Sequence, residues 1–130
     1  MATIEGEGLT AQIIHNMYGL VLDMRDNAAN YKTRLVAGQS VASVRVLMLA
    51  DADRYKERLQ LITDVASRNL AKVTAALQAR GLTVAQMVND RDAGVAAADH
   101  TLAADLSTTT AINAEADFIL ANVPAYERLW

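Results

Sequence analysis

Apolar residues recur at steps of three and four along three long stretches of the chain. In the first stretch, residues 10–37, they are Ile13, Met17, Leu20, Met24, Ala28, Tyr31 and Leu35. Because a helix has 3.6 residues per turn, this spacing places them on one face and predicts a helix. Gly38 can adopt the left-handed conformation that ends a helix, and Ser40 can cap the next one.

The second stretch, residues 41–80, contains no glycine or proline, and Gly81 follows it. Its apolar positions are Val44, Met48, Ala52, Tyr55, Leu59, Ile62, Ala66, Leu70, Val73 and Leu77. The pattern predicts one continuous helix. At 1.5 Å per residue it would be roughly 60 Å long, so we expect an elongated molecule.

The third stretch, residues 83–122, opens on Thr83 and Gln86, which are spaced as a capping box. Its stripe is Val84, Val88, Arg91, Val95, Ala98, Leu102, Leu106, Thr109, Ile112, Ala116, Ile119 and Val123. Because the stripe keeps its phase, we favour one helix. The alternative is a break near residues 107–110, where Ser107 or Thr108 would cap a fourth helix before a run of β-branched threonines. Pro124 ends the pattern.

These elements predict a single all-α domain, an elongated up-down-up bundle of three long helices over residues 1–130. An N-terminal arm, residues 1–9, and a C-terminal arm, residues 123–130, flank the bundle. The chain has 25 alanines and one proline, which favours closely packed helices. Gly19 and Gly94 lie inside predicted helices, where glycine costs about 1 kcal/mol relative to alanine, so we expect both to allow close packing.

Charge is unevenly distributed along the chain. Residues 41–81 carry seven basic and four acidic groups, whereas residues 82–130 carry two basic and seven acidic groups. We therefore expect the basic middle to pack on the acidic end, within one chain or between chains. The basic charges are mixed with acidic ones, so we do not expect nucleic acid as a partner.

Neither end nor middle carries a membrane signal. The start is acidic and has no apolar core of the kind that secretory signals contain, and no apolar run approaches 18 residues. We expect a protein without a signal peptide or transmembrane segment, in a virion or the cytoplasm.

The sequence contains no catalytic, cofactor or metal constellation. The chain has no cysteine, and no glutamate has a histidine three residues on, as di-iron bundles require. His15 borders the apolar stripe, and His100 and Asp99 diverge on a helix. The aspartate pairs at residues 51 and 53, and at residues 90 and 92, are predicted to be solvated surface. We expect a non-enzymatic protein with no cofactor, no metal and no small-molecule substrate.

The arms are the predicted contact surfaces. The C-terminal arm holds Tyr126 and Trp130 in a chain with few aromatics, and tryptophan and tyrosine are enriched at interface hot spots. The candidate interface residues are Ile4, Tyr126, Leu129 and Trp130. We favour docking of the C-terminal arm on another chain; the alternative is a lid over its own bundle.

A helical body with two such arms predicts a structural or assembly subunit that packs against copies of itself or other structural proteins. In overall character the chain resembles small helical virion proteins of tailed phages, which implies a bacteriophage virion component. The alternative is a cytoplasmic helical adaptor or chaperone that binds a partner protein in a hydrophobic groove. The adaptor predicts a small oligomer, and the particle subunit predicts a high-order assembly.

Overall fold

The computed structural model describes the backbone of residues 9–68 and 70–126, and the side chains of residues 12–62, 68 and 70–126. Over these residues the chain is all-α, as predicted, and forms no strand. Its helices are α2 (Leu9–Val36), α3 (Val41–Ser67), α4 (Leu70–Gln78), α5 (Val84–Ala103) and α6 (Thr109–Asn122). The predicted arms lie largely outside the described residues, which include only Leu9 of the first and residues 123–126 of the second.

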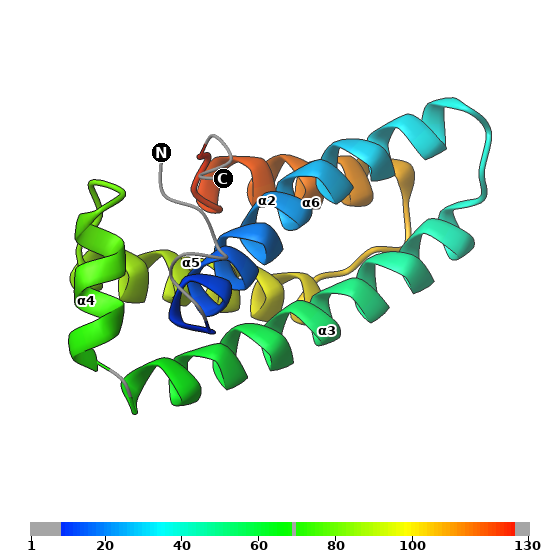
Figure 1. Ribbon diagram of the computed structural model, residues 1–130. Coiled ribbons are helices and arrows are strands. Elements are labelled where there is room, and N and C mark those ends of the chain that lie inside the picture. The colour runs from blue at the N-terminus through cyan, green and yellow to red at the C-terminus, as the bar shows by residue number, and fades with distance from the viewer. Residues whose placement is uncertain (1–8, 69, 127–130) are drawn as a thin grey trace.

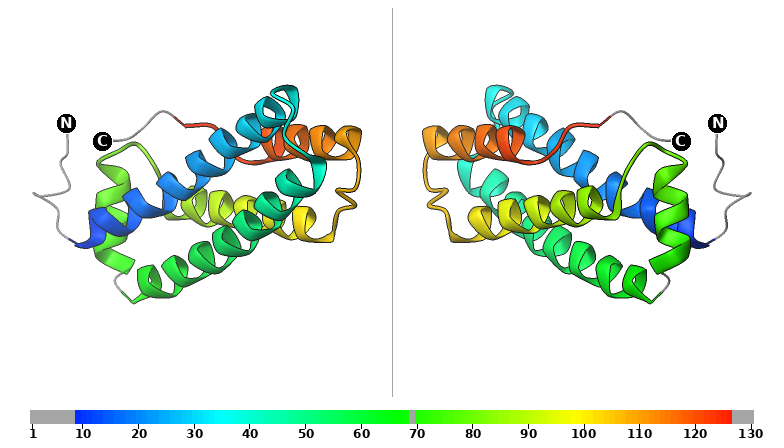
Figure 2. Two further views of the ribbon diagram at one scale, coloured as in Figure 1. Left: turned by 90° about the vertical axis from the view of Figure 1, so that its right-hand side faces the viewer. Right: turned by 90° about the vertical axis from the view of Figure 1, so that its left-hand side faces the viewer.

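Four of the described helices pack as two pairs, and α4 crosses one end of both pairs. Helix α2 lies beside α6, α3 lies beside α5, and α4 crosses one end of the bundle (Figure 1). The chain turns back between α5 and α6 at the opposite end, as both views in Figure 2 show. All of the described helices contribute to one main core, and a smaller cluster lies near the end opposite α4. The smaller cluster consists of Tyr31, Val44, Met48, Leu106 and Ile112.

The helix ends follow the sequence signals. Gly38 and Gly81 have φ angles of 92° and 74°, which glycine adopts without steric cost. The Ser40 hydroxyl accepts a hydrogen bond from the Ser43 amide at 3.2 Å. The predicted capping box is present, since Thr83 accepts from the Gln86 amide and the Gln86 side chain accepts from the Thr83 amide.

The prediction of one helix over residues 41–80 is wrong. Helix α3 ends at Ser67, and a separate helix, α4, begins at Leu70. A continuous helix would extend beyond α2, which is itself only about 42 Å long. The break instead turns α4 across the bundle and buries Val73 and Leu77, while Leu70, predicted on the buried stripe, is 56% exposed. Burial of apolar surface therefore outweighs helix continuity here.

The favoured continuous helix over residues 83–122 is also wrong, and the alternative break is confirmed. Helix α5 ends at Ala103, and the Thr108 side chain caps α6 by accepting from the Ala111 amide at 3.0 Å. Asp105 accepts from the Ser107 amide at 3.1 Å, a local hydrogen bond that competes with helix formation. The turn lets α6 fold back onto α2, so the three-helix path becomes a bundle of shorter helices.

Helix α5 buries a different face from the one predicted. Its buried residues are Met87, Gly94, Ala97, Ala98 and Thr101, of which only Ala98 belongs to the predicted stripe; Val88 and Leu102 are exposed. Small side chains let α3 approach closely, since a Cβ on Gly94 would lie 2.8 Å from Leu59 Cδ1. Close packing is therefore confirmed at Gly94. The prediction of close packing at Gly19 is wrong, because a Cβ there would meet nothing within 4 Å.

Candidate functional site between α2 and α3

Of the predicted interface residues, the structure places one. Ile4, Leu129 and Trp130 lie outside the described residues, whereas Tyr126 packs edge-on against Tyr18 of α2, with ring centroids 5.1 Å apart. Both phenol groups donate to Asp90 Oδ2, at 2.7 Å for Tyr18 and 2.8 Å for Tyr126. This part of the C-terminal arm therefore rests on its own chain. Docking of Leu129 and Trp130 stays a prediction.

Arg25 anchors the end of α6, from which the chain continues to Tyr126. Its Nη1 donates to the carbonyl oxygens of Leu120 at 2.6 Å and Val123 at 2.8 Å. These carbonyls lie at the end of α6, where helical partners run out, and a cation there also complements the helix dipole. The path from α6 to Tyr126 is thus fixed by one arginine and two tyrosines.

The Tyr126 contact predicts loss of stability at alkaline pH. Burial, together with the hydrogen bond to Asp90 and its charge, raises the pKa of Tyr126 to about 12, above an ordinary value of about 10. The stabilisation from the neutral phenol is present below about pH 10 and is lost as pH rises toward 12, because the unfolded chain ionises first.

Denaturant unfolding between pH 8 and 11.5 measures this effect. Tyr126→Phe should be less stable than wild type at pH 8 and should show a smaller decline above pH 10. Equal declines in both proteins would contradict the packing of Tyr126 on Asp90.

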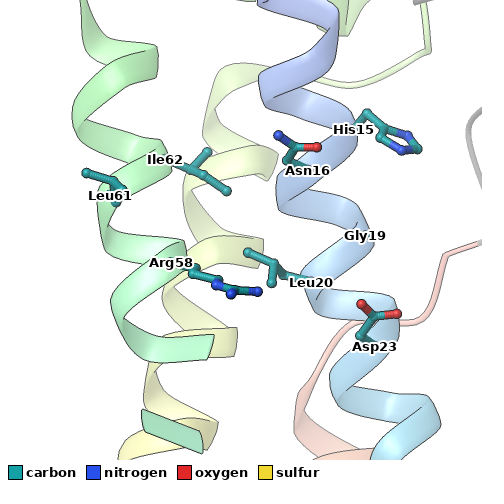
Figure 3. A pocket seen from close by; sticks show the side chains of 8 residues that line it. All are labelled: His15, Asn16, Gly19, Leu20, Asp23, Arg58, Leu61 and Ile62. Carbon is teal, nitrogen blue, oxygen red and sulfur yellow. The ribbon is translucent and has the colours of Figure 1, made fainter. Parts of the chain in front are cut away.

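An open groove of about 470 Å³ lies between α2 and α3, away from this tail contact. Helix α2 supplies His15, Asn16, Gly19, Leu20 and Asp23, and α3 supplies Arg58, Leu61 and Ile62 (Figure 3). Ile62 and Arg58 point from α3 toward α2, whereas Leu61 stands at the outer margin of α3. Gly19 contributes no side chain to the α2 wall, and a Cβ there would meet nothing within 4 Å.

The groove walls combine apolar and charged groups. Leu20 and Ile62 pack partly against the core, but Leu61 is 62% exposed. Asp23 and Arg58 are exposed, and within the described part of the chain neither forms an ion pair. Apolar and charged side chains therefore share the groove, and surfaces that bind protein combine both kinds of group.

Sequence reasoning missed this groove. Its two signals were a glycine inside a helix and Leu61, an apolar residue off the predicted stripe. His15 fits its prediction as a boundary residue, since it is half-buried beside the groove.

The polar residues outside the groove tie helices together. His100 Nδ1 lies 2.5 and 2.8 Å from the two oxygens of Glu115, whose side chain is 2% exposed, and its ring stacks on Phe118. Asp99 instead pairs with Lys56 at 2.6 Å, so the basic second stretch meets the acidic third one within the chain. Among the described residues no group of three potential metal ligands is present.

The prediction that the aspartates at residues 51, 53, 90 and 92 are all solvated surface is wrong for one member of each pair. Asp53 and Asp92 are exposed as predicted, but Asp51 is buried and Asp90 half-buried. Asp51 accepts from Tyr31 and from Arg54, the latter at 2.9 Å. On a helix the i, i+2 spacing turns the two side chains to different sides, and the structure turns one of each inward.

Comparisons with protein-family models, with curated proteins and with solved structures find no match to this chain. No described helix has the length and apolar character needed to cross a membrane. The groove between α2 and α3 is therefore interpreted from its own geometry.

Proposed function

We propose that the chain is a non-enzymatic assembly subunit that packs against other protein through the groove between α2 and α3. The observation that carries the proposal is Leu61, a large apolar side chain that is exposed beside a groove whose α2 wall includes Gly19. Apolar surface of this kind is stabilised when a partner covers it, at roughly 25 cal/mol per Å².

The body behind the groove supports this role. Its walls belong to the two longest of the described helices, of 28 and 27 residues, which pack on each other. The buried Tyr31–Asp51 hydrogen bond fixes one helix against the other. A preformed groove needs little ordering on binding, and this lowers the cost of association.

The partners in this proposal are copies of the chain or other structural proteins. A bacteriophage virion component is the specific form we propose, supported by the resemblance in overall character to small helical virion proteins. The location would then be the virion, and the predicted anchor residues Leu129 and Trp130 would add contacts to those of the groove.

A cytoplasmic adaptor or chaperone is the second candidate. The same groove favours it, because an amphipathic helix of a partner protein could lie along Leu20, Leu61 and Ile62. The two candidates differ in the mass of the purified protein, which is high for a particle subunit and small for an adaptor.

Size-exclusion chromatography with light scattering tests the proposal on the wild type and on Leu61→Asp. We expect the wild type to exceed its 14.0 kDa chain mass, and Leu61→Asp to lose most of that association while keeping its helix content. Val46→Asp is the matched control, because Val46 is also an exposed apolar residue of α3 but lies about 22 Å away along the helix.

A wild type of 14.0 kDa at every concentration would refute self-assembly and leave the adaptor. Equal association of both aspartate variants would show that assembly uses another surface.

A further inference from the structure

Leu61 and Gly19 form a protrusion and a recess on the same face of the molecule. Leu61 stands out from α3 at 62% exposure, and Gly19 on α2 leaves space in which a Cβ meets nothing within 4 Å. Figure 3 shows them on opposite sides of the groove. A surface that carries both shapes can be complementary to a copy of itself.

The charges of the groove follow the same arrangement. Asp23 lies on α2 four residues beyond Gly19, and Arg58 lies on α3 three residues before Leu61. Because α2 and α3 run in opposite directions, both charges are displaced about one turn in the same direction along the groove (Figure 3). The α2 wall therefore presents Gly19 with the charge of Asp23 about one turn away. The α3 wall presents Leu61 with the charge of Arg58 about one turn away.

We propose that a second copy of this chain occupies the groove, related to the first by a two-fold axis that runs along the groove, parallel to α2 and α3. Such an axis exchanges the two walls without shifting them lengthwise. It sets Leu61 of each copy over Gly19 of the other. By the same operation α3 of each copy comes to lie over α2 of the other, and the long side chain of Arg58 turns out of its own groove to pair with Asp23 of the other copy. The inference rests on the proposed function and names the partner at the same site.

Charge complementarity is what favours a second copy over an unrelated protein. One rotation satisfies two apolar contacts and two ion pairs, and it uses an aspartate and an arginine that form no ion pair within the described part of the chain. An interface of this kind closes as a dimer, which larger assemblies can use as a building unit.

The first test fills the recess. Gly19→Leu should preserve or raise the thermal stability of the monomer, because leucine is a better helix former and the space is open. It should weaken dimerisation, measured by sedimentation equilibrium, by about tenfold or more, since the opposing Leu61 can no longer seat. Gly19→Ala, with a much smaller side chain, is the matched control.

The second test reverses the charges singly and then mixes the variants. Asp23→Arg alone places like charges at both ion pairs of a homodimer, as does Arg58→Asp alone, so each should dimerise about tenfold more weakly at low salt. An equimolar mixture should dimerise again as a heterodimer. One of its two ion pairs is then the native one, and in the other the arginine introduced at position 23 meets the aspartate introduced at position 58.

The outcomes separate this inference from the proposed function. Association that depends on Leu61 but is unchanged by Gly19→Leu, or is not restored by mixing the charge variants, overturns the two-fold arrangement and leaves the assembly function standing. A wild type that stays monomeric at millimolar concentration overturns both the two-fold arrangement and self-assembly, and leaves the adaptor. Restored heterodimerisation, together with loss of dimerisation in Gly19→Leu, supports the arrangement.

Discussion

Replacing Leu59 by alanine is expected to lower the free energy of unfolding by roughly 2–5 kcal/mol. Leu59 is fully buried in the main core, where α3 meets α2 and α5. Its Cδ1 lies above Gly94, which has no side chain that could move into the vacated volume. The truncation therefore leaves a cavity as well as removing buried apolar surface.

Leu61→Ala is the matched control, two residues further along the same helix. Because Leu61 is largely exposed in the monomer, the same change there should alter monomer stability by no more than about 0.5 kcal/mol. Urea unfolding of both variants, at a concentration where the protein is monomeric, measures the difference. Equal losses would mean that α3 is rotated from the position described.

Removing the His100 side chain is expected to cost about 2 kcal/mol or more. Glu115 is buried on α6, and His100 is the residue of α5 that contacts both of its carboxylate oxygens. A buried carboxylate that loses its partner keeps its desolvation cost without compensation. The His100→Ala change also removes the ring stacked on Phe118, but half of the imidazole is exposed, which moderates the loss.

The comparison for His100 is Lys32, which pairs with Asp117 on the same helix α6. Both of these side chains are exposed, so Lys32→Ala should cost about 0–1 kcal/mol. Thermal unfolding of the two variants side by side checks the prediction. A loss for Lys32→Ala as large as that for His100→Ala would show that burial of Glu115 does not set the cost.

The helical class and the helix ends were predictable because their signals are local. Gly38, Gly81 and the Thr83–Gln86 box each act through neighbouring backbone groups. The break after Ser67 was not predictable in this way, because it depends on where α2 ends and on what Val73 and Leu77 can then cover. The break before Thr108 had a local signal, but the continuing apolar phase outweighed it in the prediction.

The periodicity was least informative for α5. Large apolar side chains suggested one buried face, yet the structure buries the face with Gly94 and Ala97, because close approach to α3 selects small residues. Periodicity counts apolar side chains but carries no information about the distance between helices. For the same reason, Gly19 and Gly94 look alike in the sequence, while one faces open space and the other faces Leu59.

The candidate site depends on contacts between distant residues and was therefore hidden. Gly19 and Leu61 are remote in sequence, and neither alone indicates a groove. The C-terminal arm gave a clearer signal through its aromatics, and the structure places Tyr126 on Tyr18 and Asp90 of its own chain. The proposed assembly role therefore rests on the groove between α2 and α3, and docking of Leu129 and Trp130 stays a prediction.

The most direct measurement is an isotope-filtered nuclear Overhauser experiment on a mixed sample. One half of the sample carries labelled methyl groups, the other half is unlabelled, and only contacts between copies give a signal. The account predicts contacts between the Leu61 methyl groups of one copy and the Gly19 α-protons of another. Intermolecular signals that involve other residues alone, or no intermolecular signal at concentrations where the protein is most associated, would contradict it.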